Sequence, residues 1–230
     1  MKNHIVIIGG MGPQASLSLH KRILDAAANS GAKHCHQYPQ ITHISLPIRD
    51  FISNSKNKDE ALGLIIKSLS GFIFGSNTRL VLACNTAHLL VPKLEVAMKR
   101  PVVSLIDTVV NDVSIRRLKR VGLLASPTTI QGELFSAPLE RMGAEVILPS
   151  KDSQKTVERL IRQTIANVPR STALPVLRRQ TQQMLSVGCE AVILGCTELS
   201  VINASKTNSK TIDPLTLIAQ QLVIKGTNNV

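Results

Sequence analysis

Short apolar runs alternate along this chain with longer segments whose apolar residues recur at helical spacing. The short runs, rich in Ile, Val and Leu, are typical of buried strands in parallel sheets. The predicted strands are 5–8, 40–46, 79–83, 102–104, 120–125, 145–148 and 191–194. The predicted helices are 14–28, 61–74, 87–99, 108–117, 132–142, 153–167 and 173–187. Strands that alternate with helices indicate crossover connections, so the pattern predicts an α/β protein with parallel sheets.

Two of the predicted strands end in similar sequences. The run 80–83 leads into Cys84-Asn85-Thr86, and the run 191–194 leads through a glycine into Cys196-Thr197. Ligands of open α/β sheets bind at the carboxyl ends of strands, where the next helix offers free backbone N–H groups. The repetition predicts an internal duplication and places one cysteine at the same position in each half.

Composition narrows the class of protein. The chain has 230 residues, enough for one large domain or two smaller ones, with 43% apolar and 18% charged residues, as in globular proteins. Its net charge of +12 favours anionic partners. However, the densest basic cluster, 116–120, directly precedes a strand, and the chain has no Trp, one Tyr and four Phe for base stacking. We therefore interpret that cluster as a solvated face and expect no nucleic-acid partner.

The sequence also predicts a cytoplasmic location. The apolar run after Met1 is too short for a secretory signal, and no window approaches the ~18 apolar residues of a membrane helix. We therefore expect no membrane association. Four cysteines in such a chain indicate reduced thiols, not a disulfide framework. We interpret Cys35 and Cys189, which lack the strand-end setting, as structural residues.

The glycine-rich turn after the first strand has two interpretations. Residues 10–15, GMGPQA, formally satisfy the G-x-G-x-x-A dinucleotide fingerprint at a helix start. The acidic ribose ligand expected ~20 residues later is absent, because that distance falls near 32–34. A turn whose backbone N–H groups approach a small anion fits these residues better.

Cys84 and His88 stand four residues apart, so on a helix they would share a face and could form a Cys–His pair for acyl transfer or metal binding. Further zinc ligands at matching spacing do not follow. A cysteine phosphatase would carry an arginine soon after the cysteine, and residues 85–90 contain none. Two cysteines at equivalent strand ends favour a catalytic function for Cys84 and Cys196.

Three segments together resemble the signatures of the aspartate/glutamate racemase superfamily. They are Met11-Gly12-Pro13 with Ser16, Cys84-Asn85-Thr86-Ala87-His88, and Gly195-Cys196-Thr197-Glu198. Glu198, where other branches carry histidine, is similar to the aspartate racemase branch. The resemblance covers essentially the whole chain. It implies two pseudo-symmetric flavodoxin-like parallel-sheet domains, with the active site in the cleft between them. The expected domains are 1–106 plus 213–230, and 107–212.

The resemblance also implies a homodimer that racemises an acidic amino acid, aspartate or glutamate, without a cofactor or metal. Cys84 and Cys196 would exchange the α-proton on opposite faces of the substrate. The remaining implied substrate-binding residues are Met11, Gly12, Arg49, Asn85, Thr86, Thr128, Thr197 and Glu198. Arg49 matches a Pro-x-Arg segment that contacts the side-chain carboxylate, although a solvated loop arginine remains the alternative. Ser126 and Thr128 are equally explained as helix caps.

One departure from the family leaves the substrate open. Aspartate racemases of this type usually carry a substrate-binding lysine where this chain has Ala166, and Arg162, one turn earlier, is a candidate replacement. Alternative functions are a broad-specificity racemase, an isomerase of another carbanion-forming acid such as a hydantoin, maleate or malonate derivative, and a catalytically weak small-acid-binding protein. The polar segment 53–58 is expected to be a mobile loop able to close over the site.

Overall fold

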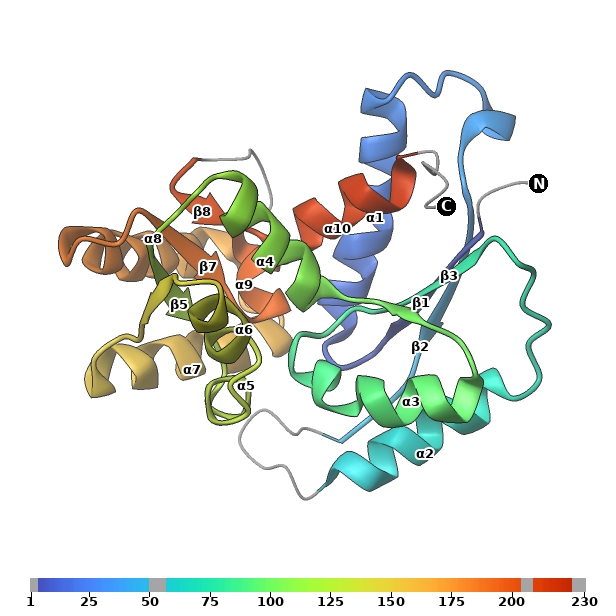
Figure 1. Cartoon of the computed structure of the whole chain (residues 1–230), viewed down its shortest axis with the longest axis horizontal. Coiled ribbons are helices and arrows are strands. Elements are labelled where there is room, and N and C mark those ends of the chain that lie inside the picture. The colour runs from blue at the N-terminus through green and yellow to red at the C-terminus, as the bar shows by residue number, and fades with distance from the viewer. Residues whose placement is uncertain (1–3, 50–56, 204–208, 225–230) are drawn as a thin grey trace.

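The computed structural model describes residues 4–49, 57–203 and 209–224, and it contains two parallel four-stranded sheets (Figure 1). The first sheet has the order β2-β1-β3-β4, formed by β1 (His4–Gly9), β2 (Gln40–Ser45), β3 (Thr78–Leu82) and β4 (Val102–Val103). The second has the order β6-β5-β7-β8, formed by β5 (Arg120–Leu124), β6 (Glu145–Ile147), β7 (Ala191–Leu194) and β8 (Thr211–Ile212). The identical strand order confirms the α/β class and the repeated architecture predicted from the sequence.

The helices connect the strands in the order expected for crossover units (Figure 1). The first part of the chain forms α1 (Pro13–Asn29), a 3₁₀ turn η1 (Cys35–Gln37), α2 (Lys58–Leu69), a 3₁₀ turn η3 (Thr86–Leu90), α3 (Val91–Met98) and α4 (Leu105–Ile115). The second part forms α5 (Pro127–Gln131), α6 (Ser136–Arg141), α7 (Lys151–Ile165), α8 (Arg170–Ser186), α9 (Thr197–Asn203) and α10 (Pro214–Val223). The helix predicted at 87–99 is divided at Val91, where η3 gives way to α3 with Pro92 in its first turn.

The strand β1 shows why the sheets appear in the sequence as continuous apolar runs. Ile5 and Ile7 pack in one buried cluster with α1, α4 and α10, while Val6 and Ile8 pack in another with α2 and α3. Successive side chains of a strand point to opposite faces, and here helices cover both faces. The sequence pattern therefore identifies the strands more surely than the face each residue occupies.

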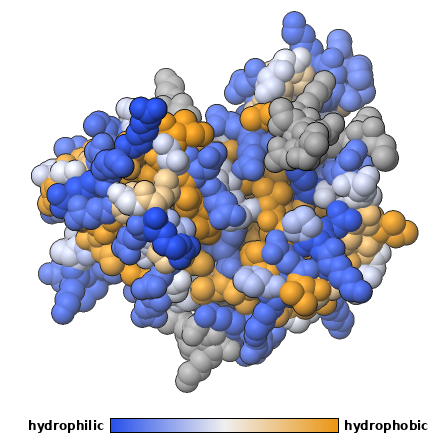
Figure 2. All heavy atoms as spheres, viewed as in Figure 1, coloured by the Kyte–Doolittle hydropathy of each residue, from blue (hydrophilic) through white to orange (hydrophobic). Residues whose placement is uncertain are grey.

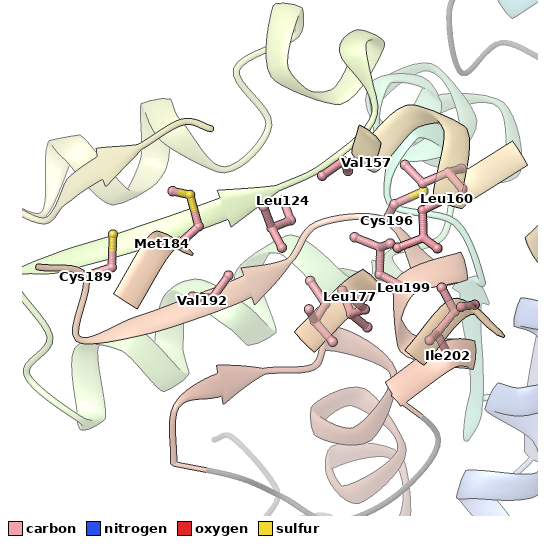
Figure 3. Packing of buried hydrophobic residues seen from close by; sticks show 13 residues of the cluster. Leu124, Val157, Leu160, Leu177, Met184, Cys189, Val192, Cys196, Leu199 and Ile202 are labelled. Atoms are coloured by element: carbon pink, nitrogen blue, oxygen red, sulfur yellow. The ribbon is translucent and has the colours of Figure 1, made fainter. Parts of the chain in front are cut away.

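The second sheet is covered in the same way. Ala191 and Ile193 of β7 pack with α4 and α6, whereas Val192 and Leu194 pack with α7 and α8. Figure 3 shows this second cluster, with Cys189 and Cys196 at opposite ends of β7. On the face shown in Figure 2, both halves of the molecule carry many hydrophilic residues, with hydrophobic residues among them. No helix in the described part of the chain is long and apolar enough to cross a bilayer.

Helix α10 returns to the first half of the molecule. It packs against α1 and α4, and it buries Leu215, Ile218 and Leu222 beside Ile5 and Ile7 of β1. The preceding strand β8 belongs to the second sheet. This packing agrees with the boundary expected near 213, although the domain limits themselves stay a prediction.

The helix predicted at 132–142 is present as α6, but its predicted beginning was wrong. Ser126 accepts a hydrogen bond from the N–H of Thr129 and begins α5 at Pro127, and the chain leaves that helix at Gly132. Glu133 then has a positive φ of 50°, so α6 begins only at Ser136. The helix predicted at 61–74 also ends early, at Leu69. Most of the expected loop at 53–58 lies outside the described residues.

Candidate active site

Cys84 and Cys196 occupy equivalent positions in the two sheets. Each follows the last residue of a central strand, β3 or β7, by two positions. Both are buried, with exposed fractions of 7% and 5%. The two strand ends meet, because the Thr197 hydroxyl lies 3.5 Å from the carbonyl oxygen of Ala83, to which it donates. The duplication therefore brings the two thiols to one shared region between the sheets.

Glu198 places a carboxylate beside these thiols. It lies in the first turn of α9 and is only 3% exposed. The Cys196 thiol donates to its Oε2 at 2.8 Å, and the Thr197 hydroxyl lies 3.4 Å from the same oxygen. The sequence identified Glu198 only as a candidate, since a first-turn acid is also explained by the helix dipole. Its burial against Cys196 shows that it belongs to the cysteine region.

Both thiols are held in the protonated form. Burial, followed by the charge of Glu198, raises the pKa of Cys84 to about 12 against the opposing effect of hydrogen bonds from Ala87 and Thr86. Burial, Glu198 and Cys84 together raise the pKa of Cys196 well above its usual value. The carboxylate of Glu198, which contacts the Cys196 thiol, therefore disfavours the thiolate form of both cysteines.

The glycine turn after β1 lies directly against the carboxylate of Glu198. Gly12 precedes α1, and a Cβ there would overlap Glu198 Oε1 and lie 3.4 Å from its Cδ. The same position is 3.8 Å from Cγ1 of Ile165, at the end of α7. Met11 packs against the apolar cluster that contains Cys84. The turn thus contributes a close backbone approach to the site.

Hydroxyl groups connect the two halves next to Cys84. The Thr86 hydroxyl lies 3.1 Å from that of Ser126 and 2.8 Å from that of Thr129. Ser126 donates to Thr129 at 2.9 Å, which closes a buried ring of three hydroxyls. Thr128 is buried in the first turn of α5, in the same segment. Thr129 was missed from the sequence, where its position three residues after a capping serine was the only signal.

The side-chain amide of Asn85 is buried without a hydrogen bond to the described residues. It is 1% exposed, and neither its Oδ1 nor its Nδ2 has a hydrogen-bond partner among the described residues. Leaving such a group unsatisfied costs ~1–3 kcal/mol, so native proteins usually provide a partner. A bound ligand with hydrogen-bonding groups would supply one beside Cys84.

His88 does not form the alternative Cys–His catalytic pair. Its Nε2 accepts a hydrogen bond from the N–H of Leu105 at 3.0 Å, so its Nδ1 carries the proton and donates to the Cys84 carbonyl at 2.9 Å. Burial lowers the pKa of His88, which favours this neutral form. His88 therefore fixes the backbone of Cys84 instead of acting on its sulfur. The described residues also contain no group of three or more His, Cys, Asp or Glu side chains suited to a metal ion.

The remaining candidates lie outside this cluster. The Arg49 side chain is 76% exposed, and its Nε lies 3.8 Å from Glu60 Oε1. Arg162 pairs with Glu158 at 3.1 Å and, together with Ala166, lines a surface pocket of about 470 Å³ along α7. The structure therefore does not bring Arg49 to the thiols.

The two other cysteines differ from each other. Cys189 is buried in the core of the second half, as expected for a structural residue. Cys35 is exposed in η1, so the expectation that it packs as a structural residue was wrong. The hydrophilic surroundings of 33–37 were the available signal.

Comparison with known proteins identifies the class. The family model of Asp/Glu/Hydantoin racemase matches residues 8–222. The chain is 24% identical to the broad specificity amino-acid racemase RacX of Bacillus subtilis (strain 168) over 86% of each chain. A glutamate racemase of Pseudomonas aeruginosa is 34% identical, over 51% of this chain and 44% of that protein.

Solved structures share the two-domain fold. An aspartate racemase homologue from Pyrococcus horikoshii OT3 superposes with a TM-score of 0.73 at 26% identity, covering 96% of this chain and 97% of that one. Picrophilus torridus aspartate racemase gives a TM-score of 0.75 at 21% identity, covering 96% and 93%. The fold is shared with these racemases, and racemases are isomerases. The chain belongs to the Asp/Glu/Hydantoin racemase family.

Proposed function

We propose that the protein interconverts the L and D enantiomers of an acidic amino acid, aspartate or glutamate, by proton transfer between two cysteines. The observation that carries this proposal is the pair of buried thiols at equivalent strand ends, in contact with one carboxylate. The α-proton of an amino acid is weakly acidic. A base on one face must remove it while an acid on the other face returns a proton.

The thiols fit these two roles. One cysteine, as a thiolate, takes the α-proton and becomes a thiol, while the other thiol gives its proton to the opposite face and becomes a thiolate. The next turnover of the same enantiomer requires the two cysteines to exchange protonation states. The reverse reaction uses the same groups with their roles interchanged, so one site serves both enantiomers.

The groups beside Cys84 suit the α-carboxylate. The Asn85 amide and the backbone N–H groups at the start of η3 are hydrogen-bond donors, and this buried amide has no partner among the described residues. Donors already in place stabilise the charge that develops as the α-proton leaves. Thr86 and Thr197 border the same region and hold the two halves together.

The side-chain specificity is the finer part of the proposal. Arg49, beyond the end of β2, is a candidate for the distal carboxylate but would have to turn inward from Glu60. Arg162 is the second candidate. Alanine at position 166 and the likeness to a broad specificity racemase favour an alternative in which neutral side chains are also accepted. A cytoplasmic homodimer remains part of the proposal.

An α-proton exchange screen tests the function. Each proteinogenic amino acid is incubated with the protein in D₂O, and loss of the Hα signal is followed by NMR. We expect exchange and racemisation of aspartate or glutamate to be faster than those of alanine. Exchange confined to neutral amino acids would favour the broad-specificity alternative, and no exchange with any amino acid would contradict racemase activity.

A further inference from the structure

The side chain of Arg22 joins α1 to the helices that follow β7 and β8. It lies in the middle of α1 and is only 15% exposed. Its Nη1 donates to Asp213 Oδ2 at 3.0 Å and to the Thr216 hydroxyl, while its Nη2 donates to the Ser200 carbonyl at 2.6 Å. Ser200 belongs to α9 and Thr216 to α10, so one guanidinium group connects these two helices to α1 (Figure 1).

Asp213, the partner of Arg22, stands where the chain leaves the second sheet. It directly follows β8, and its Oδ1 caps α10 by accepting from the N–H groups of Leu215 and Thr216. Its Oδ2 also lies 3.3 Å from the Asn203 side-chain amide, at the end of α9, which donates to it. The side chain of Asp213 is only 9% exposed, so its charge needs the adjacent guanidinium group of Arg22.

The placement of α9 matters for the site because this helix begins directly after Cys196. Its first turn carries Glu198, which lies against Gly12 at the start of α1. Ser200, which Arg22 binds, is among its last four residues, whose carbonyl groups have no partner within the helix. The helix α1 therefore holds α9 at two places, beside the thiol and near the carboxyl end.

We infer that Arg22 is a positioning residue of the site: it fixes α9 against α1 and thereby sets the separation of Cys196 and Cys84. Cys84 follows β3 of the first sheet and Cys196 follows β7 of the second, so a shift of α9 relative to α1 changes the distance between the two thiols. Arg22 acts from outside the site, since residues 12 and 22 are separated by roughly 15 Å of helix. The inference rests on the proposed function, because two-sided proton transfer needs both thiols in place.

Loss of Arg22 should affect inversion of the substrate more than exchange of its α-proton. Exchange with solvent needs one thiolate, whereas inversion also needs the second thiol on the opposite face. A misplacement of ~1 Å can cost ~100-fold in rate. We therefore expect Arg22→Met to raise the ratio of Hα exchange to inversion of aspartate by ~10-fold or more. Partial unfolding would lower both rates equally and leave this ratio unchanged.

The test measures Hα exchange by NMR and inversion by chiral chromatography, for each aspartate enantiomer in D₂O. In the double variant Arg22→Met/Asp213→Asn both charges are removed, so no uncompensated carboxylate stays buried, and asparagine can still cap α10. Arg22→Lys keeps the charge without the planar fork of donors and should restore the ratio in part. Lys21→Met is the matched control, because it removes from the next position of α1 an exposed cation that pairs with Asp25 at 2.7 Å. That control should keep the parental ratio.

A second readout follows the thiols themselves and does not require racemisation. Alkylation by iodoacetamide, quantified for each cysteine peptide by mass spectrometry, reports how often a buried thiol becomes accessible. Cys189, buried in the core of the second half, is the internal control for loosening of the whole fold. We expect Arg22→Met and the double variant to speed alkylation of Cys84 and Cys196 by about 5-fold or more relative to Cys189, because α9 opens locally.

The two readouts keep the inference separate from the proposed function. An exchange-to-inversion ratio that stays parental in both Arg22→Met and the double variant would overturn the inference. Alkylation that rises equally at Cys84, Cys196 and Cys189 would also overturn it, because Arg22 would then only stabilise the fold. If alkylation changes as expected but the parent exchanges no α-proton, the positioning of α9 by Arg22 stands and the proposed racemisation fails.

Discussion

The contact between Gly12 and Glu198 allows the site to be perturbed without altering any ionisable group. Gly12 has φ −110° and ψ 132°, an extended conformation that alanine adopts without strain. In Gly12→Ala the new methyl group would overlap Glu198 Oε1 and lie 3.4 Å from its Cδ. Any effect of this substitution therefore comes from the added methyl group and the displaced carboxylate, and not from backbone strain.

The size of the effect follows from the geometry. Normal packing separates nonbonded heavy atoms by ~3.5 Å, so the Glu198 carboxylate must move by roughly 1 Å. The overlapping atom is at the end of a flexible glutamate side chain, which can move away from the new methyl group. We therefore expect the free energy of unfolding to fall by no more than ~1 kcal/mol. Misplacement of a catalytic group by ~1 Å can cost ~100-fold in rate, so we expect kcat/KM for aspartate to fall by about that factor.

The assay combines coupled racemisation kinetics with thermal unfolding. Gly63→Ala, in α2, is the matched control, because a Cβ there meets nothing within 4 Å. That control should keep the parental kcat/KM and gain up to ~1 kcal/mol from its higher helix propensity. Parental kcat/KM in Gly12→Ala would refute the position assigned to Glu198. A loss of activity that only reflects unfolding would contradict the expectation that the fold tolerates the methyl group.

Three further predictions concern residues around the site. The pKa of His88 is lower in the folded protein than in the unfolded chain, so the unfolded chain binds more protons below pH ~6.5. The free energy of unfolding should therefore decrease by up to ~1.4 kcal/mol for each pH unit below that value, as measured by urea titrations at pH 7 and 5. The same pH dependence in His88→Gln would contradict this prediction. Arg162→Ala should reduce kcat/KM for aspartate more than for alanine, by ~10-fold or more if it binds the distal carboxylate, and a strict aspartate preference that survives the substitution would exclude that role. Arg49→Ala should raise KM for dicarboxylic amino acids far more than for alanine or serine, and equal effects would place Arg49 outside the side-chain pocket.

The alternation of apolar runs predicted most of the fold. Every strand from 5–8 to 191–194 was located to within two residues, because parallel strands covered on both faces leave a continuous apolar signal. The two-residue strand β8 carries too short a run to be recognised. The break between α5 and α6 depends on the positive φ of Glu133. No local sequence pattern predicts this backbone conformation.

The individual residues of the candidate site could be predicted from the sequence, but the contacts between distant residues could not. Cys84 and Cys196 stand out because each ends a strand of the same kind, and their neighbours follow in sequence. The contact of Glu198 with Gly12 joins α9 to the turn before α1, and sequence spacing carries no information on such distant pairs. The ring of Thr86 with Ser126 and Thr129 has the same long-range origin.

The most direct test of the account separates the two proton transfers. Racemisation and Hα exchange of each aspartate enantiomer are measured in D₂O for the parent, Cys84→Ala and Cys196→Ala, with Cys35→Ala as the control for an exposed thiol. We expect both site variants to stay folded and lose racemisation by at least ~100-fold, while each still exchanges Hα of the single enantiomer that its remaining thiol faces. The two variants should favour opposite enantiomers. Parental racemisation in either site variant would contradict the two-cysteine mechanism.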